Sequence, residues 1–159
     1  MKIPFILNSE NVIVEAEPGQ RLLNVLRNSF RLAGTKEGCT AGRCGACMVL
    51  LDGAPVSSCL IPISIIKDCE VITLEYFSQT PEYADITTGF RQAGIELCGF
   101  CSAGKIFTAH GILSKNLRPT KDDIREQLVG NDCKCVNSEL LIAGIRLAGV
   151  LKRKRLDEN

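Results

Sequence analysis

The chain has 159 residues, 45% of them hydrophobic, and its 19 lysines and arginines nearly balance 18 aspartates and glutamates. A net charge of +1, two tyrosines and no tryptophan provide neither the basic face nor the stacking aromatics of a nucleic-acid-binding protein. No apolar run approaches the roughly 20 residues that cross a bilayer, and the N-terminal residues lack the pattern of a signal peptide. We therefore expect a cytoplasmic protein without nucleic-acid or membrane partners, whose nine cysteines serve metal or redox chemistry.

The first half of the chain alternates β-rich segments with a single helix. The predicted β segments are, in chain order, residues 3–7, 11–16, 48–51, 55–58 and 71–74. Apolar residues between Leu22 and Leu26 recur at spacings of one, three and four, which is typical of a helix with one buried face. Together these elements predict a small α+β sheet domain.

A glycine-rich loop at residues 38–47 holds three closely spaced cysteines. With a more distant fourth they form the pattern C-x4-C-x2-C-x11-C, made of Cys39, Cys44, Cys47 and Cys59. The opening C-x4-C-x2-C is the spacing of plant-type ferredoxin loops that bind a 2Fe-2S cluster, whereas zinc sites usually pair two C-x2-C motifs. Gly42 and Gly45 suit such a loop, because amides that point inward at a cluster require backbone angles that a Cβ would hinder.

The second half of the chain has a helical pattern. The four candidate helices are residues 88–94, 103–113, 120–129 and 138–150. The third opens with Thr120-x-x-Asp123, which is close to a capping box. A polar connection at residues 76–85 predicts a domain boundary, which gives domains of residues 1–78 and 79–159. The second domain is expected to be all-α, with four helices.

Four further cysteines lie at the ends of these expected helices. They are Cys98, Cys101, Cys133 and Cys135, in the spacing C-x2-C-x31-C-x-C. Thiolates at helix ends can converge on one metal centre. The spacing alone leaves both a 2Fe-2S cluster and a zinc ion open.

Three other features are interpreted without a functional role. Cys69, the ninth cysteine, is expected to be a small buried hydrophobic residue beside a strand. His110 lies in an apolar helical stretch and is expected to be packed or exposed rather than catalytic. The basic run at residues 152–155 is expected to be a solvated terminal tail. No nucleophile-elbow, phosphate-loop or dinucleotide motif is present, so we expect no substrate chemistry on this chain.

The two cysteine groups, with Gly99-Phe100-Cys101 and the sequence Gly-Asn-Asp-Cys-Lys-Cys at residues 130–135, carry a family resemblance. Over residues 3–150 the chain resembles the small iron-sulfur subunit of the molybdenum hydroxylases, the xanthine dehydrogenase, aldehyde oxidoreductase and carbon monoxide dehydrogenase family. The resemblance implies an N-terminal plant-type 2Fe-2S ferredoxin domain of β-grasp fold and a C-terminal four-helix 2Fe-2S domain. It also implies electron transfer from a molybdopterin site on a large subunit to FAD on a medium subunit, in a duplicated heterotrimer.

By the same resemblance, the cysteines of the first group would ligate the cluster nearer the flavin and those of the second group the cluster nearer the pterin. Cys135 and Gly99 would lie on the pterin side, and Gly42 and Gly45 in the flavin-side loop. Each assignment is an expectation for the residue that occupies the matching position in this sequence.

Departures from the family pattern lie mainly near the second group. Leu97 stands where a glutamine amide usually contacts the pterin, and it cannot donate a hydrogen bond. The others are Ser102-Ala103 in place of Thr-Pro, Lys134 in place of arginine, Asn137-Ser138 in place of Gly-Tyr and, in the first loop, Ala41 in place of an often acidic residue. We therefore expect retained electron transfer and a large subunit that binds its cofactor somewhat differently.

Two other hypotheses are kept beside this one. A free-standing two-cluster ferredoxin would usually be strongly acidic to steer toward basic partners, and a net charge of +1 gives no such field. A zinc-stapled interaction module would be colourless and would give no EPR signal after reduction.

Overall fold

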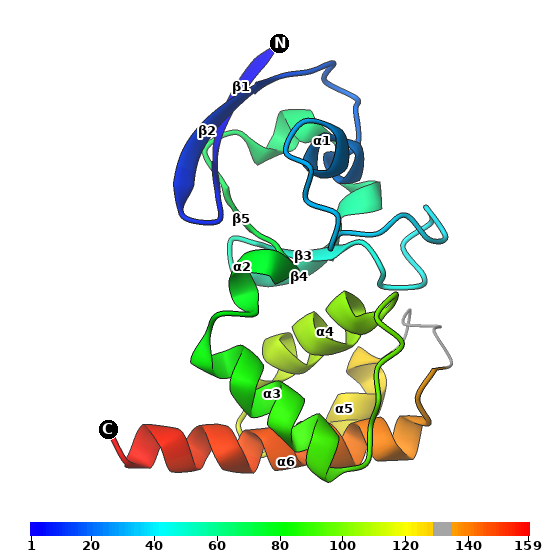
Figure 1. Ribbon diagram of the computed structural model, residues 1–159, viewed down its shortest axis with the longest axis vertical. Helices are drawn as coiled ribbons and strands as arrows, with labels where there is room; N and C mark the ends of the chain where they lie inside the picture. The colour runs from blue at the N-terminus through cyan, green and yellow to red at the C-terminus, as the bar shows by residue number, and fades with distance from the viewer. Residues whose placement is uncertain (129–134) are drawn as a thin grey trace.

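The computed structural model describes residues 1–128 and 135–159. A sheet domain comes first and a helical domain follows it along the long axis of the molecule (Figure 1). The expected α+β class, with the strands in the first half and the helices of a four-helix unit in the second, is confirmed. The predicted boundary between residues 78 and 79 falls in the short turn between two helices, and its position stays a prediction.

Five strands form one mixed sheet. They are β1 (Lys2–Leu7), β2 (Glu10–Glu15), β3 (Met48–Leu51), β4 (Ala54–Ser57) and β5 (Glu70–Ile72). Their order is β2-β1-β5-β3-β4, and β1 runs parallel to β5 while the other pairs are antiparallel. The predicted last strand ends at Ile72 rather than at residue 74, because Leu74 begins a helix.

Helix α1 (Leu22–Asn28) covers the sheet and closes the first core. Its apolar face brings Leu22, Val25 and Leu26 into one cluster with strand residues such as Ile3 and Phe5, all of them at most 2% exposed. Two short 3₁₀ turns, Ser58–Leu60 and Ile63–Ile66, complete this domain. The periodicity of the sequence correctly located this helix because its buried residues are adjacent in the chain.

The remaining helices are α2 (Leu74–Phe77), α3 (Pro81–Gln92), α4 (Ser102–Lys115), α5 (Lys121–Gln127) and α6 (Ser138–Asp157). The predicted polar connection at residues 76–85 is wrong at both ends, because α2 extends to Phe77 and α3 begins at Pro81, seven residues before the expected residue 88. The Thr80 hydroxyl accepts a hydrogen bond from the Tyr83 amide at 3.2 Å, and Pro81 occupies the first turn. Both features start a helix regardless of the polar residues that follow.

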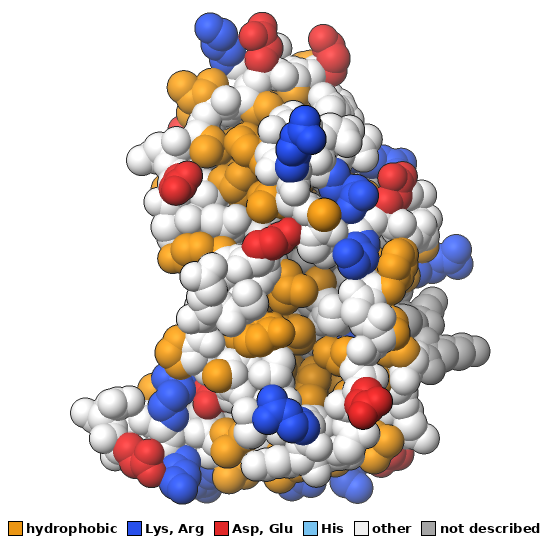
Figure 2. All heavy atoms as spheres, viewed as in Figure 1, with side chains coloured by type: hydrophobic (Ala, Val, Ile, Leu, Met, Phe, Trp, Pro, Cys, Tyr) orange, Lys and Arg blue, Asp and Glu red, His pale blue; other side chains and the backbone are white. Residues whose placement is uncertain are grey.

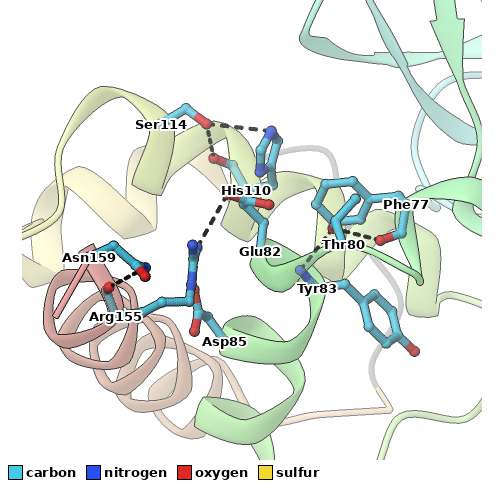
Figure 3. A network of polar contacts seen from close by, with 9 residues as sticks. All are labelled: Phe77, Thr80, Glu82, Tyr83, Asp85, His110, Ser114, Arg155 and Asn159. Carbon is cyan, nitrogen blue, oxygen red and sulfur yellow. Dashed lines mark hydrogen bonds and ion pairs between the residues drawn. The ribbon is translucent and has the colours of Figure 1, made fainter. Parts of the chain in front are cut away.

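Helix α6 runs through the basic segment that was expected to be a solvated tail. Arg155 donates from Nε and Nη2 to Asp85 Oδ2 at 2.9 and 2.8 Å, and from Nη2 to Glu82 Oε1 at 3.2 Å (Figure 3). The tail prediction is therefore wrong for Arg155, which fixes the last turns of α6 to α3. The capping box at the start of α5 is confirmed, with Thr120 and Asp123 exchanging hydrogen bonds.

Helix α4 joins the two domains by lying against β3 and β4 (Figure 1). Leu50 of β3 belongs to the same buried cluster as Phe107 of α4, and the rings of Phe107 and Phe77 are 5.1 Å apart between centroids. Hydrophobic side chains also gather at the surface around the junction of the domains (Figure 2). The junction is thus a continuation of the helical core. Among the described helices, none combines the length and apolarity needed to span a membrane.

Candidate metal centres

The first cysteine loop directs its backbone amides at a sulfur. Cys39 Sγ accepts hydrogen bonds from the amides of Ala41 at 3.4 Å, Arg43 at 3.2 Å and Cys44 at 3.3 Å. These amides, those of Ala41 and Arg43 foremost, lower the pKa of Cys39 to about 6. A nest of amides stabilises an anionic sulfur, which is the form that binds metal.

Glycines make this loop possible. Gly42 and Gly45 have φ angles of +72° and +73°, in the left-handed region that disfavours side chains, so the expected conformational role of both is confirmed. At Gly38 the constraint is space, since a Cβ would lie 2.6 Å from Cys44 Sγ. A side chain at Gly38 would therefore occupy the space beside the Cys44 sulfur.

The other two members of the first group lie beneath the loop. Cys47 and Cys59 are 3% and 1% exposed and pack with Leu23 of α1. Burial, followed by the neighbouring Cys47 thiol, raises the pKa of Cys59 to about 11. A buried thiol of this kind loses its proton when a bound cation supplies positive charge. This group thus combines one thiol that ionises easily with one whose ionisation requires a metal.

In the second group, three of the four cysteines are described and they converge. The sulfurs of Cys98, Cys101 and Cys135 all lie within 4.8 Å of one another, with Cys98 to Cys101 at 3.4 Å and Cys101 to Cys135 at 2.9 Å. The Cys101 amide, then the Cys101 thiol and the Phe100 amide, lower the pKa of Cys98 to about 6. Cys133, the expected fourth ligand, lies outside the described residues.

Local structure explains several departures from the family pattern. Leu97 packs against the helical core. Asn137 caps α6 by accepting a hydrogen bond from the Glu139 amide at 2.8 Å, a bond that a glycine could not make. Gly99 has a φ of +76°, and its carbonyl accepts from the Ser102 hydroxyl at 3.3 Å. Lys134 lies outside the described residues.

The two cysteine loops lie against each other. A Cβ on Gly38, next to Cys39, would be 3.2 Å from Cε1 of Phe100, which lies between Cys98 and Cys101. At a second point, a Cβ on Gly104 would be 2.8 Å from the Gly45 carbonyl oxygen. Gly104 was not singled out from the sequence, although a glycine in the first turn of an expected helix is a signal for close packing.

The remaining sequence features lie away from these loops. Cys69 is half-buried and packs against the first core, and burial raises the pKa of its thiol. The half-buried His110 ring stacks edge-on against Phe77 at 4.8 Å, and its Nε2 is 3.5 Å from the Ser114 hydroxyl (Figure 3). Burial lowers the pKa of His110. The packed role expected for His110 fits these contacts.

The donor sets fit iron-sulfur clusters. Each group consists of cysteine thiols, the soft ligands that Fe-S clusters take, and the first group has amides directed at Cys39 Sγ and a glycine, Gly38, beside Cys44 Sγ. We find no oxygen or histidine ligand among the three converging groups of the second site. The described cysteines of both groups thus provide the thiol ligands that 2Fe-2S clusters take.

Comparison with known proteins gives matches over nearly the whole chain. Residues 5–68 match the 2Fe-2S iron-sulfur cluster binding domain family, and residues 73–146 match the 2Fe-2S binding domain family. The nicotinate dehydrogenase small FeS subunit of Eubacterium barkeri is 37% identical over 142 residues, which cover 89% of this chain and 90% of that protein. The nicotine 6-hydroxylase small subunit of Paenarthrobacter nicotinovorans is 32% identical over 145 residues, which cover 91% of this chain and 87% of that protein.

The fold also matches solved structures. A chain of quinoline 2-oxidoreductase from Pseudomonas putida 86 superposes with a TM-score of 0.84 and 36% identity, covering 96% of both chains. Aldehyde oxidoreductase from Desulfovibrio desulfuricans has a TM-score of 0.85 at 30% identity, where the match covers 96% of this chain and 17% of that longer one. With its two 2Fe-2S binding domains, the chain belongs to the family of small iron-sulfur subunits of the molybdenum hydroxylases, a family of oxidoreductases.

Proposed function

We propose that this chain relays single electrons from a molybdopterin site on a large subunit to FAD on a medium subunit of one hydroxylase. Cys39, Cys44, Cys47 and Cys59 would hold the flavin-side 2Fe-2S cluster, and Cys98, Cys101, Cys133 and Cys135 the pterin-side one. Each cluster, when bound, accepts and releases one electron. The protein residues hold the sulfurs, supply amide hydrogen bonds to them and exclude water from the buried ones.

The observation that carries this proposal is the contact between the two cysteine loops. The Phe100 ring lies beside Gly38, and Gly104 at the start of α4 lies on Gly45, so residues within three positions of the cysteines pack the two sites against each other. A rigid contact of this kind holds two redox groups at a fixed separation. A zinc-stapled module would have no use for such proximity.

The partners and the location are part of this proposal. The relatives are subunits by name, which supports a large molybdopterin-binding partner and a medium FAD-binding partner in a duplicated heterotrimer. Cys135 and Gly99 would then face the pterin, and Gly42 and Gly45 the flavin side. The proposed location is the cytoplasm, where thiols are kept reduced for metal or redox chemistry.

Cysteine replacements test the ligand assignment. Cys44→Ala should remove one of two rhombic EPR signals of the dithionite-reduced protein and leave the other, whereas Cys101→Ala should do the reverse. Cys69→Ala is the matched control, because Cys69 packs against the first core away from both loops, and it should retain both signals. Loss of both signals together in each ligand variant would contradict two independent sites.

Isolation with natural partners tests the relay itself. The chain should co-purify with subunits that contain molybdenum and flavin, at four iron atoms per copy of this chain if both clusters are 2Fe-2S. A colourless protein without an EPR signal would contradict the cluster assignment. A coloured, two-cluster protein that purifies alone under the same conditions would support the free-standing ferredoxin instead.

A further inference from the structure

The outer side of α6 carries a groove that the cysteine sites do not use. Its volume is about 740 Å³, and the residues that matter for its chemistry are Leu117, Arg118, Arg146, Leu147, Val150 and Arg153. Helix α6 lies at the end of the molecule opposite the sheet domain (Figure 1). The groove is therefore separated from the contact between the two cysteine loops.

Close packing of a loop on α6 forms the groove. The loop between α4 and α5 rests on Gly149, where a Cβ would be 2.7 Å from the Leu117 carbonyl oxygen. Arg146, Val150 and Arg153 follow at spacings of four and three, so they share one face of the helix. The loop and this face form the two walls, and both are fixed by backbone contact.

The charge of the groove is entirely positive. Arg118, Arg146 and Arg153 are its charged residues, and no aspartate or glutamate is found among the described residues that line it. None of the three forms an ion pair within residues 1–128 and 135–159, whereas Arg125 and Arg155 each have carboxylate partners. In addition, Arg153 Nε is shielded from solvent and lacks a hydrogen-bond acceptor in the part of the chain that the structure describes. The three arginines that line the groove therefore leave it with positive charge that carboxylates of another chain can neutralise.

We propose that the groove binds an acidic segment of a partner subunit, in which carboxylates flank an apolar side chain. The planar guanidinium groups match carboxylates in bidentate geometry. Leu117, Leu147 and Val150 supply an apolar surface for the side chain between them. This inference rests on the proposed function, because it takes the partner from the same hetero-oligomer. An open groove whose walls combine arginines with apolar side chains has the composition of a protein interface rather than of a small-anion site.

Charge reversal within the cluster-loaded chain tests the groove. Arg146→Glu/Arg153→Glu should weaken association with the partner subunits by about tenfold or more, measured by biolayer interferometry, because close interfacial charge pairs contribute strongly to affinity. Lys2→Glu/Lys67→Glu changes the net charge equally on exposed residues of the sheet domain and should leave the affinity within about twofold. Cluster absorbance and thermal unfolding of each variant show whether it folds, and Arg146→Gln/Arg153→Gln gives a milder change at the same positions.

The outcomes separate this inference from the proposed function. If both groove variants bind the partner subunits with wild-type affinity, the proposal for the groove is wrong, and the proposed electron relay is unaffected. If the sheet-domain control loses as much affinity as the groove variants, the loss is an effect of net charge and the proposal for the groove is also wrong. If the wild-type chain associates with no subunit, both fail. A photoreactive residue at Val150, which is 49% exposed, provides a second readout in the assembled complex. Crosslinking to a partner peptide with at least two acidic residues supports the groove, and crosslinking only to a second copy of this chain overturns it.

Discussion

Gly104, in the first turn of α4, lies directly against Gly45 of the first cysteine loop, so that a Cβ on Gly104 would be 2.8 Å from the Gly45 carbonyl oxygen. The two metal centres are thus positioned by a contact between two backbones. No side chain intervenes that could adapt to a change.

Replacement of Gly104 by alanine should destabilise the protein by about 1–3 kcal/mol, the usual cost of overpacking against backbone that cannot move aside. Differential scanning calorimetry of the cluster-loaded protein would measure this as a lower Tm. Gly19→Ala is the control, because no atom lies within 4 Å of the added methyl group, and its Tm should stay unchanged or rise slightly. An unchanged Tm in Gly104→Ala would show that the loops can separate freely.

The pairing of Arg155 with Asp85 should contribute more than a surface ion pair. Their side chains are 28% and 11% exposed, whereas those of Arg125 and Glu139 are 51% and 56% exposed at an even shorter 2.6 Å. Arg155→Met should therefore lower the free energy of unfolding by roughly 1–3 kcal/mol, because Asp85 loses its partner in a largely buried position. Arg125→Met should cost less than about 1 kcal/mol. Urea unfolding of both variants measures the two losses. An equal loss of unfolding free energy in Arg155→Met and Arg125→Met would contradict a special role for the contact between α3 and α6.

His110 predicts a specific pH dependence. Burial, followed by the charge of Lys152, lowers its pKa below the value of an unfolded chain, and Glu82 opposes the shift. The unfolded state therefore binds more protons once the pH falls below about 6.5, and stability decreases from there down to the folded pKa. Above that range the residue has no effect on the pH profile.

The matching variant is His110→Phe, which keeps the ring contact with Phe77 and removes the titration. As the pH falls below about 6.5, the stability of the wild type should decrease more steeply than that of His110→Phe, as followed by thermal unfolding at a series of pH values. Parallel curves for the two proteins would contradict a buried, neutral histidine. The comparison between variants removes any acid sensitivity that the clusters contribute to both.

The cap of α6 gives a graded prediction. Asn137→Ala should cost about 1 kcal/mol because the Glu139 amide loses its acceptor, while Asn137→Gly should cost only a few tenths. Chemical denaturation would resolve the first change and scarcely the second. The reverse order would mean that Asn137 serves a contact outside this chain rather than the helix cap.

The fold and most of the cysteine geometry could be predicted because their signals are local. Three of these signals depend on residues close in sequence: the spacing of Cys39, Cys44 and Cys47 within one loop, the periodicity of α1 and the capping box of α5. The start of α3 was missed although its signals, the Thr80 cap and Pro81, are local. The end of α6 could not be predicted, because polar Asp85 and Arg155 become largely buried only by pairing across 70 positions. A local pattern cannot distinguish such a pair from solvated charge.

The contact between the metal loops escaped prediction for the same reason. Gly104 and Gly45 are 59 positions apart, by subtraction of their numbers in the sequence, and each alone resembles an ordinary loop or helix glycine. What identifies Gly104 is the absence of space for a Cβ against Gly45, which depends on how α4 lies on β3 and β4. Predicting it would have required the relative placement of two domains.

The parallel pairing of β1 with β5 has a consequence for how the protein is made. Ile6 and Leu7 align with Glu70 and Val71, so the first strand has no neighbour on that edge until about half of the chain has left the ribosome. The cysteines of the first loop emerge before that point, and those of the second loop after it. Biogenesis should therefore proceed in two stages, in which the first thiolate site is enclosed within a finished sheet before the second site has been synthesised.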